Sequence, residues 1–223
     1  MRTAIVSISM LMLSGAASAV DFGQPSKRTG KWEAGALLNY VDNWDVSGAN
    51  ATKIDVDDDI GWGLAVGYNF NEHFNITAEF TFNEQSYDAT VVPQDPAGPA
   101  FDIHHKLDND AVNFNFTYNV LARSITPFFS GGVGWTYLDS NISNGDINAA
   151  CWWDPFWGYV CAPYYSTYSD TSLSYGLDAG VRWDVGRNTV IKASVGRKWI
   201  DMDGVHDTPD MLNGKLGVVW MFE

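Results

Sequence analysis

Apolar and polar residues alternate along most of the chain, and this period of two residues predicts β-strands with two different faces. In the stretch 60–70, every second residue from Ile60 to Phe70 is bulky and apolar, whereas the residues between them, from Gly61 to Asn69, are small or polar. The same period predicts eight strands, over residues 31–41, 60–70, 74–83, 112–120, 129–137, 173–184, 189–199 and 212–222. A strand of about ten residues is long enough to cross a bilayer at a tilt.

The connections between these strands are short and long in strict alternation. The short ones fall near Asn71, near Ala122 and at 186–188. The long ones are rich in Asp, Asn, Gly and Pro, and span residues 42–59, 84–108, 139–171 and 200–210. In an up-and-down antiparallel sheet, strict alternation places all four long connections at one end.

Alternation alone does not say which face is inside, because a soluble lipocalin-like barrel also alternates. An eight-stranded barrel has an interior only just wide enough for side chains to fill it. We therefore expect the small and polar face in the lumen and the bulky apolar face outside, where only lipid makes it stable. Aromatic residues near the strand ends are then expected to form two interfacial girdles. They are Trp32, Tyr40, Trp62, Phe70, Phe74, Phe82, Tyr118, Trp183 and Trp220.

The start of the chain has the layout of a secretory signal peptide. A basic residue, Arg2, precedes an apolar run over residues 4–13 and a small-residue site at 17–19. The run is shorter than the roughly 20 residues that a membrane helix needs. We therefore expect residues 1–19 to be cleaved after Ala19 and the chain to be exported.

The charge balance excludes one class of partner. The formal net charge is -14, whereas binding to nucleic acid depends on Lys and Arg neutralising phosphates. We expect no nucleic-acid partner.

With a signal peptide, alternating strands, the stretch TPFFSGGVGW at 126–135 and an aromatic closing strand, the chain resembles the small eight-stranded outer-membrane barrels of the OmpA/OmpX type. It departs from them at its end, where Glu223 follows Phe222. The resemblance covers nearly all the mature chain. It implies an all-β fold, an eight-stranded antiparallel up-and-down transmembrane β-barrel with four long outer loops and three short periplasmic turns.

The same resemblance implies a location integral to the bacterial outer membrane. The expected organisation is a signal peptide at 1–19, a short periplasmic N-terminal segment at 20–30 and the barrel at 31–223, with no peptidoglycan-binding domain after it. The expected partners are outer-membrane lipid and lipopolysaccharide, and the chain is expected to be a monomer without a cofactor.

The predicted register collects charged residues in the lumen. They are Lys31, Glu33, Glu79, Asp178, Arg182, Asp184, Lys192, Lys198 and Lys215. Buried charge is costly unless it is paired, so we expect a charge network that plugs the barrel, with Glu33, Glu79, Asp178, Arg182, Lys192, Lys198 and Lys215 as its members. The alternative is a narrow gated channel or a proton path.

The sequence was also compared with what a lipid-A-modifying enzyme and a calcium site require. A barrel enzyme that modifies lipid A needs a His and a Ser with an acidic partner, but His73, His104, His105 and His206 fall in turns and loops with no nearby Ser in strand register. We therefore expect no enzyme. The acidic run 55–59 and the acidic residues of 201–210 lack the complete spacing of a calcium loop, so we interpret them as a solvated rim and expect no metal site.

The third long connection contains the stretch CWWDPFWGYVC, from Cys151 to Cys161. In an exported chain, this pair of cysteines predicts a disulfide. The turn residues of the stretch favour a compact irregular tip over a regular strand or helix. Its rings, at Trp152, Trp153, Phe156, Trp157 and Tyr159, are candidates for binding protein, glycan or lipid.

The alternative is that these rings fold back onto the barrel mouth or dip into the outer leaflet. The sequence thus predicts a structural or surface-interaction role, adhesin-like, with a host or cell-surface ligand bound by the loops. A lipid-A-modifying enzyme and a narrow gated channel remain alternatives, and a soluble ligand carrier comes last.

Overall fold

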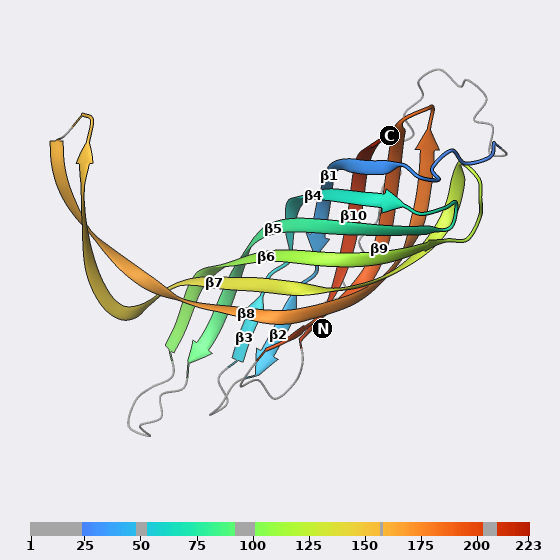
Figure 1. Ribbon diagram of the computed structural model, residues 1–223. Helices are drawn as coiled ribbons and strands as arrows, with labels where there is room; N and C mark the ends of the chain where they lie inside the picture. Colours follow the sequence, from blue (N-terminus) through green and yellow to red (C-terminus); the bar gives the residue numbers. More distant parts are fainter. Residues whose placement is uncertain (1–23, 48–52, 92–100, 157, 203–208) are drawn as a thin grey trace, which may run out of the picture.

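Alternating small and bulky residues give strands that close on themselves as one antiparallel barrel (Figure 1). The computed structural model describes residues 24–47, 53–91, 101–156, 158–202 and 209–223. The barrel wall consists of β1 (Trp32–Val41), β4 (Asp59–Asn69), β5 (Phe74–Val91), β6 (Phe101–Asn119), β7 (Ile125–Asp154), β8 (Gly158–Val185), β9 (Thr189–Asp201) and β10 (Asp210–Phe222). Each pairs with its neighbours in sequence order, and β1 pairs with both β4 and β10, which closes the barrel. The predicted eight-stranded up-and-down barrel is confirmed.

The faces lie as the sequence predicts. On β4, Trp62 is 54% exposed on the outer surface, whereas Asn69 is fully buried on the inner one. Asparagine and threonine line much of the lumen, and at Gly134 a side chain is excluded outright because its Cβ would collide with the carbonyl oxygen of Val112 on β6. Volume therefore decides the orientation of the strands, because the inner face has no room for the bulky residues.

Aromatic rings gather in pairs near both ends of the outer surface. At the end with the short turns, Trp32 contacts Tyr68 with ring centroids 5.0 Å apart. At the opposite end, Trp62 and Phe82 lie 4.8 Å apart. The apolar band between the two sets consists of aliphatic and aromatic side chains that face away from the protein.

Several strands run well past their predicted ends. Strand β5 continues to Val91 and β6 begins at Phe101, so much of the expected loop 84–108 is strand. The first long connection holds a small hairpin of β2 (Trp44–Ser47) and β3 (Lys53–Val56), whose β3 pairs with the extension of β5. Strands thus extend into segments expected to be connections, because cross-strand pairing satisfies the backbone despite the turn-forming residues.

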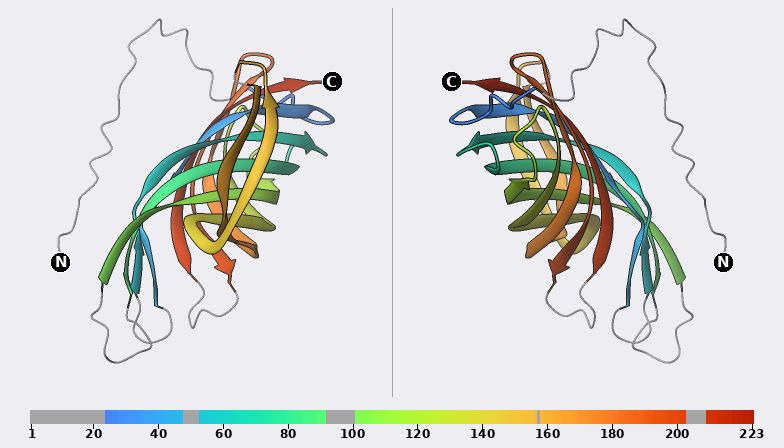
Figure 2. Two further views of the ribbon diagram at one scale, coloured as in Figure 1. Left: turned by 90° about the vertical axis from the view of Figure 1, so that its left-hand side faces the viewer. Right: turned by 90° about the vertical axis from the view of Figure 1, so that its right-hand side faces the viewer.

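The largest departure is the β7–β8 hairpin. Residues 143–154 pair with residues 158–167 of β8 and leave the barrel at the left of Figure 1; in the left panel of Figure 2 they lie in front of it. The expectation that the stretch from Cys151 to Cys161 is not a regular strand was wrong. Cys151 and Cys161 are opposite partners in the ladder, and β7 ends only at Asp154 and β8 begins at Gly158.

The short turns at 70–73, 120–124 and 186–188 share one end of the barrel with the N-terminal residues 24–30. We call this the inner end and the opposite one the outer end. No helix in the described ranges is long and apolar enough to span a membrane.

Candidate functional site

An ion cluster around Glu33 lies in the lumen near the inner end. This carboxylate on β1 receives Nη2 of Arg182 at 2.6 Å and Nζ of Lys192 at 2.6 Å, and its side chain is almost fully buried. Arg182 also contacts Asp184, with Nε 2.7 Å from Oδ1. These charges come from strands on different sides of the barrel, so the cluster ties the wall together across the lumen.

A second cluster lies around Lys215 on β10. Its Nζ is 2.8 Å from Oε2 of Glu79 and 3.5 Å from Oδ2 of Asp178. Asn213 donates from Nδ2 to Oδ1 of Asp178 at 3.1 Å. The two clusters bring together the predicted lumen charges except Lys31 and Lys198.

Asparagines connect the ion clusters to the wall, a feature that the sequence analysis did not single out. Asn69 donates to Oε1 of Glu33 at 2.7 Å, and Asn75 donates to Asn69 at 3.2 Å. Farther out, Asn39 donates to Oδ1 of Asn83 at 2.8 Å. The sequence signal was the recurrence of Asn on the small-residue face, which indicates a lumen built for hydrogen bonding rather than for apolar packing.

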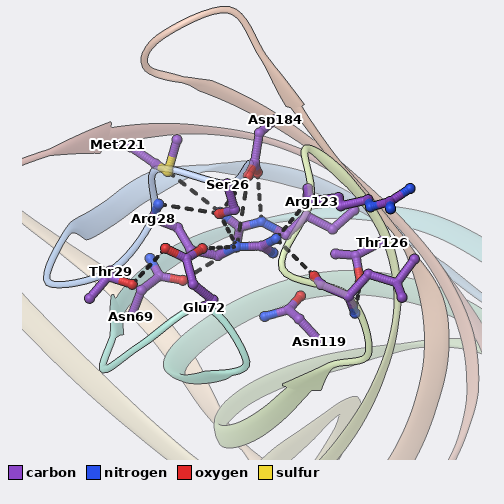
Figure 3. Close-up of polar contacts among 12 residues, drawn as sticks. Ser26, Arg28, Thr29, Asn69, Glu72, Asn119, Arg123, Thr126, Asp184 and Met221 are labelled. Carbon is purple, nitrogen blue, oxygen red and sulfur yellow. Dashed lines mark hydrogen bonds and ion pairs between the residues drawn. The ribbon is translucent and has the colours of Figure 1, made fainter. Parts of the chain in front are cut away.

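Arg28 closes the inner end of the lumen (Figure 3). Its side chain is fully buried and donates from Nη2 to the carbonyl oxygens of Leu121, at 3.2 Å, and Arg123, at 2.6 Å. Its Nε contacts the hydroxyl of Ser26 and lies 3.8 Å from Oδ2 of Asp184. We call residues 24–30 the strap, because they cross this end and are bonded to the β6–β7 turn on the far side.

An apolar cluster closes the outer end. Its buried members come from the β2–β3 hairpin and from the outer ends of strands that form the wall. They are Val41, Trp44, Val56, Tyr87, Ile200 and Met211. We call this cluster the lid. It could not be predicted, because Trp44 and Val56 fall in a segment expected to be a connection between strands.

Two small cavities remain between the strap and the lid. The upper one, below the lid, holds about 40 Å³ accessible to the centre of a water molecule and is lined by asparagines together with Lys198 and Lys215. The lower one holds about 60 Å³ and is lined by Glu79, Lys192 and Ser194 among others. Since one water needs roughly 10–15 Å³ by this measure, each cavity has room for a few waters.

The tip of the β7–β8 hairpin carries exposed rings. Trp153 is 73%, Phe156 88% and Tyr159 70% exposed, and Trp153 and Tyr159 are opposite partners in the ladder. Trp157 lies outside the described residues. For Trp152, Cys151 and Cys161 the backbone is described and the side chains are not, so the disulfide stays a prediction.

The three histidines in the described residues do not come together as a catalytic group. His73 contacts the carbonyl oxygen of Asn119 at 2.7 Å and stacks on Tyr118, whereas His104 pairs with Asp88 on the extension of β5. His206 lies outside the described residues. Within the described ranges, no group of three or more His, Cys, Asp or Glu residues has the arrangement of a metal site.

Comparison with known proteins agrees with this architecture. A family described as "Outer membrane protein beta-barrel domain" matches residues 5–222. The solved structure of the outer membrane protein OprG from Pseudomonas aeruginosa is similar over 89% of this chain and 98% of its own, at 12% identity and a TM-score of 0.55. At this identity, the likeness establishes the fold.

Two more distant likenesses are Ail, the attachment invasion locus protein of Yersinia pestis, and Neisserial surface protein A. Ail, solved in complex with the heparin analogue sucrose octasulfate, matches 86% of this chain and 99% of its own at 17% identity and a TM-score of 0.47. Neisserial surface protein A matches 86% of this chain and 96% of its own at 12% identity and a TM-score of 0.47. No curated protein sequence matches the chain.

Proposed function

Since the chain belongs to the family of outer membrane protein beta-barrel domains, we propose that it is a surface-interaction protein whose β7–β8 hairpin binds a ligand outside the cell. It is an integral outer-membrane barrel, and its apolar outer surface faces lipid. In such barrels the short turns are periplasmic and the longer connections extracellular. The strap therefore belongs to the periplasmic end, and the hairpin reaches into the exterior.

The observation that carries this proposal is the length and the tip of the hairpin. Strand β6 accompanies β7 only as far as Ser140, and β9 accompanies β8 only from Leu173. Beyond Ser140, β7 continues for the 14 residues 141–154, and among the described strands it pairs there with β8 alone. At a rise of about 3.3 Å per residue, this ribbon is roughly 45 Å long.

A ribbon of this length presents its rings far from the wall. The tip of the ribbon exposes the apolar rings of Trp153, Phe156 and Tyr159 to water. An approaching surface would contact this tip first. Tryptophan and tyrosine are the residue types that most often dominate binding surfaces. Two register shifts, between Asp139 and Ser143 and between Ser143 and Ile147, bend the ribbon at its base and direct the tip.

The experiment compares cells that display the wild type with cells that display the triple variant Trp153→Ala, Phe156→Ala, Tyr159→Ala. Adhesion is measured to a glycan array and to immobilised matrix and serum proteins. We expect the wild type to bind and the triple variant to lose roughly tenfold or more in affinity, since each such anchor contributes more than about 1 kcal/mol. The matched control is Ser169→Ala, an exposed residue at the base of the hairpin, which retains binding.

Two results contradict the proposal. One is that the wild type binds none of these surfaces or that the triple variant binds equally well. The other is that lipids with brominated acyl chains quench the fluorescence of Trp153. The Trp153 signal is the difference between the spectra of the wild type and of Trp153→Phe. That result would place the tip in the outer leaflet, which is the alternative given in the sequence analysis.

No observation favours the two other candidate functions. A narrow channel needs a continuous path, whereas the strap and the lid each close one end of the lumen. A lipid-A-modifying enzyme needs a His with a nucleophile in reach. The described histidines instead contact a backbone carbonyl, an aspartate or an aromatic ring.

A further inference from the structure

Exposed cations collect at the inner end of the barrel, although the chain as a whole is acidic. The full chain has 13 Lys and Arg residues against 27 Asp and Glu residues. At the inner end, cations lie on the strap, directly before β1, in the β6–β7 turn and in the β8–β9 turn. We call them the inner-end cations, and they are Lys27, Lys31, Arg123 and Arg187. Lys31 is half-buried and the other three are exposed.

Carboxylates at the inner end do not neutralise these cations. Glu72 and Asp184 instead contact the buried Arg28 of the strap. Among the described residues, the carboxylates that remain at this end belong to Glu223, which follows β10. Within the described ranges, none of the four inner-end cations forms an ion pair. The inner end therefore carries an excess of exposed positive charge.

Arg123 illustrates how the backbone is fixed while the cation stays available. Its carbonyl oxygen accepts from Nη2 of Arg28 at 2.6 Å, and it forms an isolated bridge with Pro25 of the strap. Figure 3 shows its guanidinium directed away from the polar cluster around Arg28. The strap thus holds the main chain of Arg123 and leaves its charge to an external partner.

The neighbours of the inner-end cations indicate where that partner lies. The turns at 70–73, 120–124 and 186–188 are short, so their residues stay close to the ends of the strands that cross the membrane. Apolar side chains in these turns are exposed as well: Phe70 is 54%, Val120 36% and Leu121 43% exposed. Apolar and basic side chains side by side suit the boundary between hydrocarbon and headgroups better than open water.

We propose that the inner-end cations bind the phosphate groups of anionic phospholipids in the periplasmic leaflet and enrich these lipids around the barrel. Lys and Arg at a membrane surface attract anionic headgroups directly, and each added cation strengthens the attraction. This inference rests on the periplasmic orientation of the short turns and not on any activity of the hairpin.

The acidic outer end does not cancel this attraction. The hydrocarbon between the two ends is about 30 Å thick. Exposed charges are largely screened beyond about 8 Å at physiological ionic strength. Headgroups of the periplasmic leaflet therefore respond to the cations beside them, although the net charge of the chain is -14.

The test measures which lipid the barrel prefers. The protein is folded into phosphatidylcholine vesicles that contain a trace of phosphatidylglycerol or of phosphatidylcholine with a dansyl label on the acyl chain. Energy transfer from tryptophan to dansyl reports the association of each lipid. We expect the wild type to favour phosphatidylglycerol by roughly threefold or more, and high salt to remove this preference.

A pair of double variants assigns the preference to the inner end. Arg123→Gln with Arg187→Gln is expected to lose most of the preference, while the carbonyl of residue 123 still accepts from Arg28. The matched control is Lys106→Gln with Arg197→Gln, which removes two exposed cations from the outer half and is expected to retain the preference. If the first double variant lacks the heat-induced gel shift of a folded barrel, the single change Arg187→Gln takes its place.

Three results overturn the proposal. The first is equal association of the two lipids with the wild type. The second is a preference that persists in the variant without the turn arginines or in high salt. The third is that the wild type in micelles, but not this variant, is retained on purified peptidoglycan while neither shows a lipid preference. That result would assign the inner-end cations to an anionic polymer of the periplasm.

Discussion

Lys215 reaches across the lumen from β10 to Glu79 on β5, with Nζ 2.8 Å from Oε2. The two strands are not neighbours in the wall, because β1 and β4 lie between them. The ion pair is therefore a brace inside the barrel, independent of the hydrogen-bond ladder that forms the wall.

Removing the cation from this brace is expected to destabilise the barrel strongly. Lys215→Met leaves Glu79 and Asp178 without their partner in an enclosed lumen, and an uncompensated buried charge of this kind costs about 3–5 kcal/mol. The free energy of unfolding, from urea titration followed by tryptophan fluorescence in micelles, measures the loss. The double variant Glu79→Gln, Lys215→Met removes both charges of the pair, so it should recover part of the stability. A loss as large in the double variant as in the single one would show that the effect is lost packing, not unpaired charge.

The strap is expected to block access to the lower cavity, and the lid is expected to block access to the upper one. Ser194→Cys reports on the lower cavity and Thr81→Cys on the upper one, and their modification by a small neutral thiol reagent is followed by mass spectrometry. Adding Arg28→Ala should make the cysteine at 194 more reactive and leave the one at 81 protected, because Asp178 and Lys215 border both cavities and separate them. Adding Trp44→Ala, which opens the lid, should do the reverse. Rapid reaction of both cysteines without either opening change would mean that the ends are not closed.

Substitutions at two glycines on opposite faces of β7 test whether the inner face lacks room for a bulky side chain. Gly134→Val directs a branched side chain into the lumen against the backbone of Val112, and overpacking of this kind costs about 1–3 kcal/mol. Gly131→Val makes the same change on the outer face, where the nearest atom to the new Cβ is Cδ2 of Leu177 at 3.4 Å. We expect the first variant to lose folded yield and unfolding free energy and the second to match the wild type. The gel shift on heating and urea unfolding measure both quantities, and equal losses at the two positions would contradict the assignment of faces.

The predicted disulfide has a clear local readout. Cys151 and Cys161 are opposite partners in the ladder, and such partners lie close enough for a sulfur–sulfur bond. The free hairpin is a two-stranded ribbon, which is marginally stable by itself. Cys151→Ala with Cys161→Ala should therefore make the tip more sensitive to protease and leave the urea midpoint of the barrel unchanged. Mass analysis without reduction identifies the bond directly, and two free thiols there would refute it.

The fold could be predicted from the sequence because a period of two residues and the volume of a small lumen leave few alternatives. Size alone places Trp62 on the outer face of the barrel and Gly134 on the inner face. The long extensions of β5 to β8 could not be predicted, since Asn, Asp, Gly and Pro favour turns locally while cross-strand pairing acts over a longer range.

The charged lumen residues were visible in the sequence, but the details of their pairing were not. Whether Lys192 or Lys198 meets Glu33 depends on how far the strands are staggered around the barrel, which no single segment encodes. The role of Arg28 could not be predicted either. It stands in a short polar stretch with no periodicity, and the carbonyl groups that it contacts belong to a distant turn.

The strap sets an order on the folding of the barrel. Arg28 is bonded to carbonyl groups 93 and 95 residues farther along the chain, and Ser26 to Asp184 across 158 residues. Contacts between such distant residues carry a large loop-closure cost and form late unless nearer contacts have first brought their ends together. The first described residues of the chain are therefore expected to reach their final position late, so that the inner end closes after the wall around it has formed.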